Sequence, residues 1–245
     1  MAVFRSLAAG LLLVYFFFSP ALADEGRTVE VNGIRNPELK RYRVMLAGLD
    51  AFDEYHMLAP KAPGVRFKLR ARSGDDTTTA LENLTLRIAG DQTSVTVPLT
   101  ADGLFSLPRS AALADEDADL VLNQRKGNYR WDAEVRTEGL PPDVRRLGDL
   151  RLECEVKVAV AKKEMPFWLH ATITSLLVTN HWCGSEKLNW ISHSPRALRL
   201  ATLVAGDQRV ALKLGDEGKS FTSPTSDKNY PDDALIELEY MDAGR

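Results

Sequence analysis

Cysteine, histidine and familiar catalytic motifs are all scarce in this chain of 245 residues, which has two cysteines and four histidines. The sequence contains no HExxH, GxSxG, GxGxxG or CxxC pattern and no GxxxxGK[ST] phosphate loop. Each of these patterns places particular side chains or glycines where its chemistry needs them. Their absence lowers the expectation of a zinc hydrolase, a serine hydrolase with a nucleophile elbow, a nucleotide-binding enzyme or a dithiol oxidoreductase.

A predominant charge and long hydrophobic runs are missing from most of the chain. Lys and Arg number 31 against 34 Asp and Glu, the net charge is −3, and the two signs are interspersed. Proteins that neutralise phosphates gather positive charge on one surface, so we expect no nucleic-acid partner. The apolar stretch Phe167–Val178 is shorter than the roughly 20 residues that a membrane-spanning helix needs. We therefore expect no membrane span in the mature chain.

Residues 1–23 have the order of a secretory signal peptide. Arg5 supplies the positive charge, and Leu7–Phe18 is an apolar run too short to span a bilayer. Ser19-Pro20 then breaks the helix, and Ala21-Leu22-Ala23 offers small residues for cleavage before Asp24. The sequence predicts an exported protein, periplasmic or secreted, whose mature chain begins near Asp24.

Both cysteines, Cys154 and Cys183, lie in the predicted mature chain. An isolated pair in an oxidising compartment typically forms one disulfide. We expect these two residues to be joined.

Most of the mature chain alternates apolar and polar residues with a period of two, which is typical of half-buried β-strands. Turn signals such as Gly90-Asp91 and Gly206-Asp207 separate these runs. The segments expected to be strands are Tyr42–Leu46, Val65–Arg72, Leu84–Ile88, Val95–Leu99, Tyr129–Arg136, Leu150–Val160, Val210–Leu214 and Ile236–Tyr240. Two short segments, Asp50–Leu58 and Ser110–Asp115, are expected to be helical.

The pattern predicts an all-β protein of two antiparallel β-sandwich domains. The Gly-Pro-rich segment Glu138–Asp149 suggests the boundary, with a first domain over residues 24–140 and a second, holding the disulfide, over residues 149–245.

Two segments look like copies of one another. Residues 84–108 and 200–224 both contain an AGDQ turn, and these turns lie 116 residues apart. Phe105 and Phe221 have the same separation, as do Pro108 and Pro224. The agreement of a turn, an aromatic residue and a proline favours an internal duplication.

The order of strand, Gly-Asp turn, strand, Asp-Gly and aromatic strand resembles transthyretin-like, carboxypeptidase-regulatory-like and other Ig-like exported modules. The resemblance covers about 40 residues in each copy. It implies a β-sandwich without catalytic activity.

Two sets of residues are candidate ligand contacts. Arg66, Lys68, Arg70 and Arg72 lie on one face of a predicted strand, where they would suit an anionic surface such as a glycolipid, or else pair with acids across strands. The tryptophans Trp182 and Trp190 would suit sugar stacking, although tryptophans also commonly pack over a disulfide.

A cluster of His170, His181, Cys183 and His193 offers an alternative chemistry. A thiolate beside an imidazole can act as a nucleophile or a metal ligand, provided that the fold brings them together. The predicted disulfide removes the thiolate, so we expect no catalytic residue, no metal site and no cofactor.

The sequence therefore favours an exported, non-enzymatic binding or accessory protein of the cell envelope. Its partner stays open: an envelope protein, a glycan or a glycolipid. The alternatives are a carbohydrate- or glycolipid-binding module and a hydrolase or metal-dependent enzyme that uses the histidine–cysteine cluster.

Overall fold

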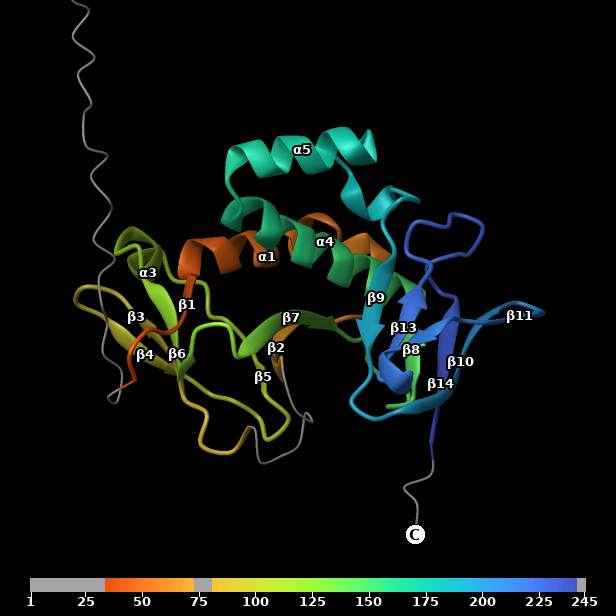
Figure 1. The fold of residues 1–245 in the computed structure, drawn as a ribbon, viewed down its shortest axis with the longest axis horizontal. Helices are drawn as coiled ribbons and strands as arrows, with labels where there is room; N and C mark the ends of the chain where they lie inside the picture. The colour runs from red at the N-terminus through yellow and green to blue at the C-terminus, as the bar shows by residue number, and fades with distance from the viewer. Residues whose placement is uncertain (1–33, 73–80, 242–245) are drawn as a thin grey trace, which may run out of the picture.

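The computed structural model describes residues 34–72 and 81–241, which form a largely β fold of four antiparallel sheets with a few helices (Figure 1). The predicted leader and its cleavage site lie outside these residues. The strands are β1 (Pro37–Arg41), β2 (Val65–Ala71), β3 (Leu86–Ala89), β4 (Ser94–Val97), β5 (Leu104–Phe105), β6 (Asp119–Arg125), β7 (Tyr129–Val135), β8 (Val144–Arg146), β9 (Trp190–His193), β10 (Leu198–Ala205), β11 (Gln208–Ala211), β12 (Leu214–Gly215), β13 (Ser220–Ser223) and β14 (Leu235–Tyr240).

The helices are α1 (Tyr42–Glu54), α3 (Ala111–Asp115), α4 (Leu147–Glu164) and α5 (Phe167–Leu177), with 3-10 turns η1 (His56–Leu58), η2 (Trp182–Gly184) and η3 (Asp216–Gly218). Helices α1 and α4 pack against each other, and α5 lies on the outer side of α4 (Figure 1). Within the described residues, no helix has both the length and the apolar content that crossing a bilayer requires.

Two sheets have four strands each, in the orders β1-β6-β3-β4 and β11-β10-β14-β8. Two smaller sheets have the orders β5-β2-β7 and β12-β13-β9. Most of the predicted strands are confirmed with small changes of boundary, because their alternating pattern places one face in a core and the other in solvent. The prediction of one strand over Val210–Leu214 is wrong, because Val210 lies in β11 and Leu214 in β12, and these strands belong to different sheets.

The prediction of a strand over Leu150–Val160 is wrong, because this segment forms the middle of helix α4. Its even-numbered residues are apolar, and in a helix such positions fall into two rows spaced four apart on opposite sides. Leu152 and Val156 pack into the core that contains α1, whereas Cys154 and Val158 pack against Trp182 on the other side. A helix that is buried on both sides therefore shows the same alternation as a strand.

The prediction of a strand over Tyr42–Leu46 is also wrong, because these residues begin helix α1. Its buried residues Tyr42, Met45, Leu49 and Phe52 have helical spacing, which extends the helix expected over Asp50–Leu58 towards the N-terminus.

The predicted helix over Ser110–Asp115 is confirmed as α3, where the Ser110 hydroxyl accepts a hydrogen bond from Leu113 N–H at 3.4 Å.

The strand pairs next to the two AGDQ turns have the same register at an offset of 115 residues, but the turns themselves differ: Ala89 lies opposite Ser94, whereas Ala205 lies opposite Gln208. Ile88 lies opposite Val95 and Leu120, and Leu203 lies opposite Val210 and Ile236 in the same way. The edge strands β1 and β8 also correspond. Strand β1 pairs with β6, strand β8 pairs with β14, and each edge strand leads directly into a helix. The first helical residue donates its N–H to the alanine before that strand in both cases, Tyr42 to Ala118 O and Leu147 to Ala234 O, each at 2.8 Å.

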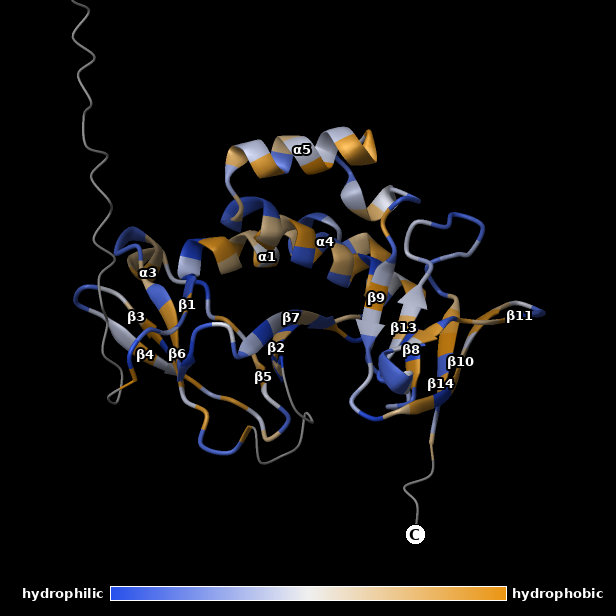
Figure 2. Ribbon diagram, in the orientation of Figure 1, coloured by the Kyte–Doolittle hydropathy of each residue, from blue (hydrophilic) through white to orange (hydrophobic). Residues whose placement is uncertain are grey.

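Apolar side chains gather in three clusters, and apolar segments are visible on β6, β10 and β14 in Figure 2. The largest cluster includes Phe67, Phe105 and Leu122; the second includes Phe221 and Ile236. Helix α4 contributes to all three clusters, so it connects the two halves of the chain. The division into domains at residues 140–149 stays a prediction.

Buried carboxylates of α4 complete the edge of β7. Glu153 accepts a hydrogen bond from Val135 N–H at 2.9 Å, and Asp149 accepts one from Thr137 N–H at 2.9 Å. Residues four apart on a helix lie at nearly the spacing of alternate residues on a strand, so two helix side chains replace a neighbouring strand.

Candidate functional site

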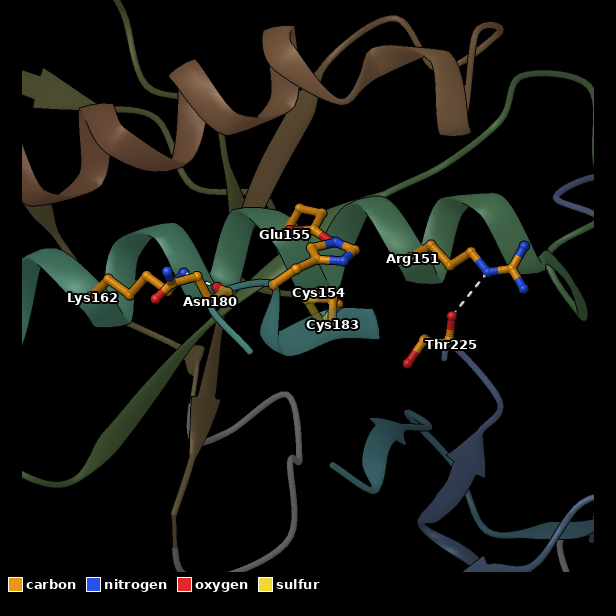
Figure 3. Close-up of a disulfide and its surroundings, with 8 residues drawn as sticks. Arg151, Cys154, Glu155, Lys162, Asn180, Cys183 and Thr225 are labelled. Carbon is orange, nitrogen blue, oxygen red and sulfur yellow. Dashed lines mark hydrogen bonds and ion pairs between the residues drawn. A yellow bond between two sulfur atoms is a disulfide. The ribbon is translucent and has the colours of Figure 1, made fainter. Parts of the chain in front are cut away.

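A disulfide joins Cys154 on α4 to Cys183 on η2, with the two Cα atoms 5.9 Å apart (Figure 3). This confirms the pairing expected from the sequence. Both cysteines are buried and pack with Val158 and Trp182. The bond fixes the segment after α5 against the middle of α4.

A carboxylate–imidazole pair stands beside the disulfide. Nε2 of His181 lies 2.7 Å from Oε1 of Glu155, and the side chain of Glu155 is only 9% exposed. Burial raises the pKa of Glu155, and the hydrogen bond from His181 opposes that rise. A Cβ atom at position 184 would lie 2.6 Å from Nδ1 of His181, so Gly184 gives the imidazole room.

The Glu155 carboxylate lines a pocket of about 410 Å³, which is within the range of small-molecule sites. Four segments that are distant in the sequence form its walls: the end of α1 with η1, one side of α4, η2, and the loop between β13 and β14. The lining residues are Tyr55, Leu58, Arg151, Glu155, His181, Cys183, Gly184, Thr225, Ser226, Lys228, Tyr230, Pro231 and Asp232.

Arg151 holds the β13–β14 loop in place. Its guanidinium donates to the carbonyl oxygens of Thr225 at 3.0 Å, Asp227 at 2.5 Å and Tyr230 at 3.0 Å (Figure 3 shows the first). It also pairs with the Asp232 carboxylate at 2.5 Å. The positive charge of Arg151 is therefore already matched by groups of the protein.

Two carboxylates act on the Tyr55 hydroxyl in the wall of the pocket. The pKa of the Tyr55 hydroxyl is raised, first by burial and then by the nearby charges of Glu155 and Glu54. The ring of Tyr55 stacks on that of His181, with centroids 6.4 Å apart. An aromatic face and a buried carboxylate thus lie side by side.

The basic row of β2 lies away from this pocket and is paired with other groups of the protein. Arg66 is 3.6 Å from Glu134, Lys68 is 3.2 Å from Asp102, and Arg70 is 3.2 Å from Asp132. Arg72 donates to Tyr129 O at 3.2 Å. These contacts agree with the alternative in which the row pairs across strands.

The two candidate tryptophans have different surroundings. Trp182 is buried against the disulfide, and its Nε1 donates to Thr174 Oγ1 at 3.2 Å. Trp190 is partly buried beneath Lys157, which also pairs with Asp132 at 3.2 Å. Trp190 also packs against the disulfide cluster that contains Trp182, and Lys157 and Asp132 connect it to Arg70 of the basic row. Their part in ligand binding stays a prediction.

The three histidines of the candidate cluster have different side-chain contacts. His170 packs against Trp182 with ring centroids 5.5 Å apart, His181 pairs with Glu155, and His193 is half-buried near Asp132. Across residues 34–72 and 81–241, no group of three His, Cys, Asp or Glu side chains is arranged to hold a metal ion.

Sequence reasoning missed Tyr55, Arg151, Glu155 and Tyr230. One signal was present, since Glu155 follows Cys154 and His181 precedes Cys183 by two residues, so a disulfide between the cysteines must bring this pair close. The chain matches no protein-family model, no curated protein and no solved structure.

Proposed function

We propose that this chain is an exported, non-enzymatic binding protein whose pocket beside the disulfide accepts a small ligand bearing an ammonium group. The observation that carries the proposal is the buried Glu155 carboxylate in the wall of a 410 Å³ pocket. A buried carboxylate loses hydration, and a cation placed against it restores favourable interactions. Tyr55 and Tyr230 supply aromatic faces, which also favour an ammonium group.

The positive side chains of the pocket do not oppose the binding of a cation. Arg151 is matched by Asp232 and three carbonyl oxygens, so its charge does not favour an anion. Lys228 is exposed, whereas Glu155 is buried. Because His181 engages Oε1 of Glu155, we infer that the ammonium group approaches Oε2 and that its apolar part contacts Leu58 and Tyr230.

The surroundings of His181 support binding over hydrolysis. Its Nε2 is engaged with Glu155. A serine hydrolase needs the other ring nitrogen within hydrogen-bond reach of a serine hydroxyl, and among the described residues no serine side chain is hydrogen-bonded to His181.

The test compares three probes of similar shape by isothermal titration calorimetry: benzylammonium, benzyl alcohol and benzoate. We expect benzylammonium to bind at least about tenfold more tightly than the other two, since a charge-assisted contact is worth about 1.5–3 kcal/mol. The variant Glu155→Gln should remove this preference, and the exposed Glu186→Gln should keep it.

A ranking in which benzoate binds best, or an unchanged preference in Glu155→Gln, would contradict the proposal. Circular dichroism and a melting curve show whether Glu155→Gln is folded, and Tyr230→Leu provides a second variant that leaves the carboxylate intact. Tyr230→Leu should weaken all three probes while benzylammonium stays the best.

We also propose that the two halves are β-sandwich-like domains that arose by internal duplication. The shared registers around both AGDQ turns, and the matching order of edge strand, helix and four-stranded sheet, support it. Strand β7, which flanks β2, has no described counterpart beside β9. Superposing residues 34–125 on residues 142–241 of an experimental structure tests this, with Phe105 expected on Phe221.

Export is the remaining part of the proposal, and it rests on the order of residues 1–23. N-terminal sequencing of the protein from its own cells should find a chain that begins near Asp24. Recovery of a chain that retains Met1 would contradict it.

A further inference from the structure

Helix α5 presents an apolar surface to solvent. None of its 11 residues, all within the described part of the chain, is buried. The exposed fraction is 83% for Phe167 and 67% for both Trp168 and Leu176, and Val178 just after the helix is 78% exposed. Apolar residues at both ends of α5 are visible in Figure 2. Soluble proteins rarely gather such side chains on one outer surface unless it binds something.

The outward half of α5 is uncharged. The exposed residues fall within half a turn at 100° per residue, and they are Phe167, Trp168, Ala171, Thr172, Ser175 and Leu176. The inward half, which includes Ile173 and Leu177, packs against the disulfide cluster. An ordinary surface helix has the reverse arrangement, with charged residues facing solvent.

Lysines stand at both ends of this uncharged surface. Lys162 and Lys163 lie in the last turn of α4 just before it. The Nζ atom of Lys162 donates to Asn180 O at 2.7 Å, and that of Lys187 donates to Leu176 O at 3.1 Å. The acid next to the first pair, Glu164, is matched by Lys40 at 2.5 Å. Glu186 is the one other acid within two residues of these lysines in the sequence, so positive charge is in excess.

We infer that α5 is an interfacial helix that lies flat on an anionic lipid bilayer. Aromatic and aliphatic side chains on one half of a helix, with lysines at its ends, match the composition of helices that rest at the boundary between headgroups and acyl chains. Phe167 and Trp168 enter the interface at one end and Leu176 and Val178 at the other. Lys163 at one end and Lys187 at the other contact the anionic headgroups.

The test is sedimentation of the mature chain with vesicles of phosphatidylglycerol and phosphatidylcholine, or of phosphatidylcholine alone. We expect binding to the anionic vesicles, a blue shift of tryptophan fluorescence, and at least tenfold weaker binding in 0.5 M salt, because salt screens the headgroup charge. The double variant Phe167→Ser, Trp168→Ser should bind at least about tenfold more weakly, because it removes two aromatic side chains from the interface.

A matched control keeps the result specific to α5. Met57 is 82% exposed on another element, so Met57→Ser should bind the vesicles like the original chain. The double variant changes exposed residues only, and its melting temperature should stay near that of the original. Absence of binding to the anionic vesicles would overturn the inference. A dimer in light scattering that the double variant abolishes, without vesicle binding, would assign the surface to self-association instead.

Discussion

Nε2 of His181 lies 2.7 Å from Oε1 of Glu155, and this pair joins the same two segments as the Cys154–Cys183 disulfide. The covalent bond and the polar pair are neighbours because each cysteine is within two residues of a member of the pair. The wall of the pocket is thus held by two cross-links of different chemistry, and each can be removed separately.

The disulfide should contribute substantially to stability. It closes a loop with a sequence separation of 29 residues, which corresponds to about 3–4 kcal/mol in the chain-entropy model. Urea denaturation of Cys154→Ala, Cys183→Ala should show a loss of this size. Dithiothreitol should destabilise the original chain similarly and leave the variant unaffected. Equal stability of the variant and the original chain without reductant would contradict the prediction.

The buried ion pair of Glu153 and Arg145 should matter far more than an exposed pair. Their atoms are 2.7 Å apart, and Glu153 also accepts the Val135 N–H. Glu153→Ala leaves a buried guanidinium and a strand N–H without this partner, so we expect a loss of about 3–5 kcal/mol in urea denaturation.

The control for this variant is Glu237→Ala. Glu237 pairs with Arg209 on the surface, where ion pairs contribute less than about 1 kcal/mol. A similar loss for the two variants would show that burial does not set the energy of these pairs.

Stability should fall on acidification because of His193. Burial lowers its pKa first, Arg130 lowers it further, and Asp132 opposes them, with Arg70 and Lys157 also facing the ring. The folded protein therefore binds a proton less readily than the unfolded chain, whose histidine titrates near 6.5. The contribution is fully present above that pH and is lost as pH falls towards the lower folded-state pKa.

The measurement is the free energy of unfolding in urea at several pH values between 5 and 8. His193→Gln should flatten the fall on the acidic side, and His170→Gln should leave the fall in place. An unchanged pH profile in His193→Gln would contradict this assignment.

Gly48 allows α1 and α4 to approach closely. A Cβ atom there would lie 2.9 Å from Cγ2 of Val160 and 3.2 Å from Cγ1 of Val156. Gly48→Leu should therefore cost about 1–3 kcal/mol or more through overpacking, and Val160→Ala in the same chain should recover part of the loss. Gly64→Ala is the control because a Cβ there meets nothing within 4 Å. The measurement is the melting temperature of each variant. A Gly48→Leu protein that melts at the same temperature as the original chain would contradict the close approach of α1 and α4.

The sequence by itself determined the features that depend on neighbouring residues. Strands such as β2 and β7 alternate because one face is buried, and the two AGDQ segments form turns through local backbone preferences. The disulfide was also predictable, since a chain with two cysteines offers only one internal pairing.

Tertiary structure alone decided the identity of α4 and the location of the pocket. The alternation over residues 150–160 fits a strand with one buried face, and it fits a helix with two buried faces equally well. The helix forms because α1 packs on one side of this segment and η2 on the other. The pocket draws Tyr55, Glu155, His181 and Tyr230 from four segments whose proximity no local pattern encodes. Local periodicity specifies which faces are buried, whereas the number of partners that bury them is a property of the whole fold.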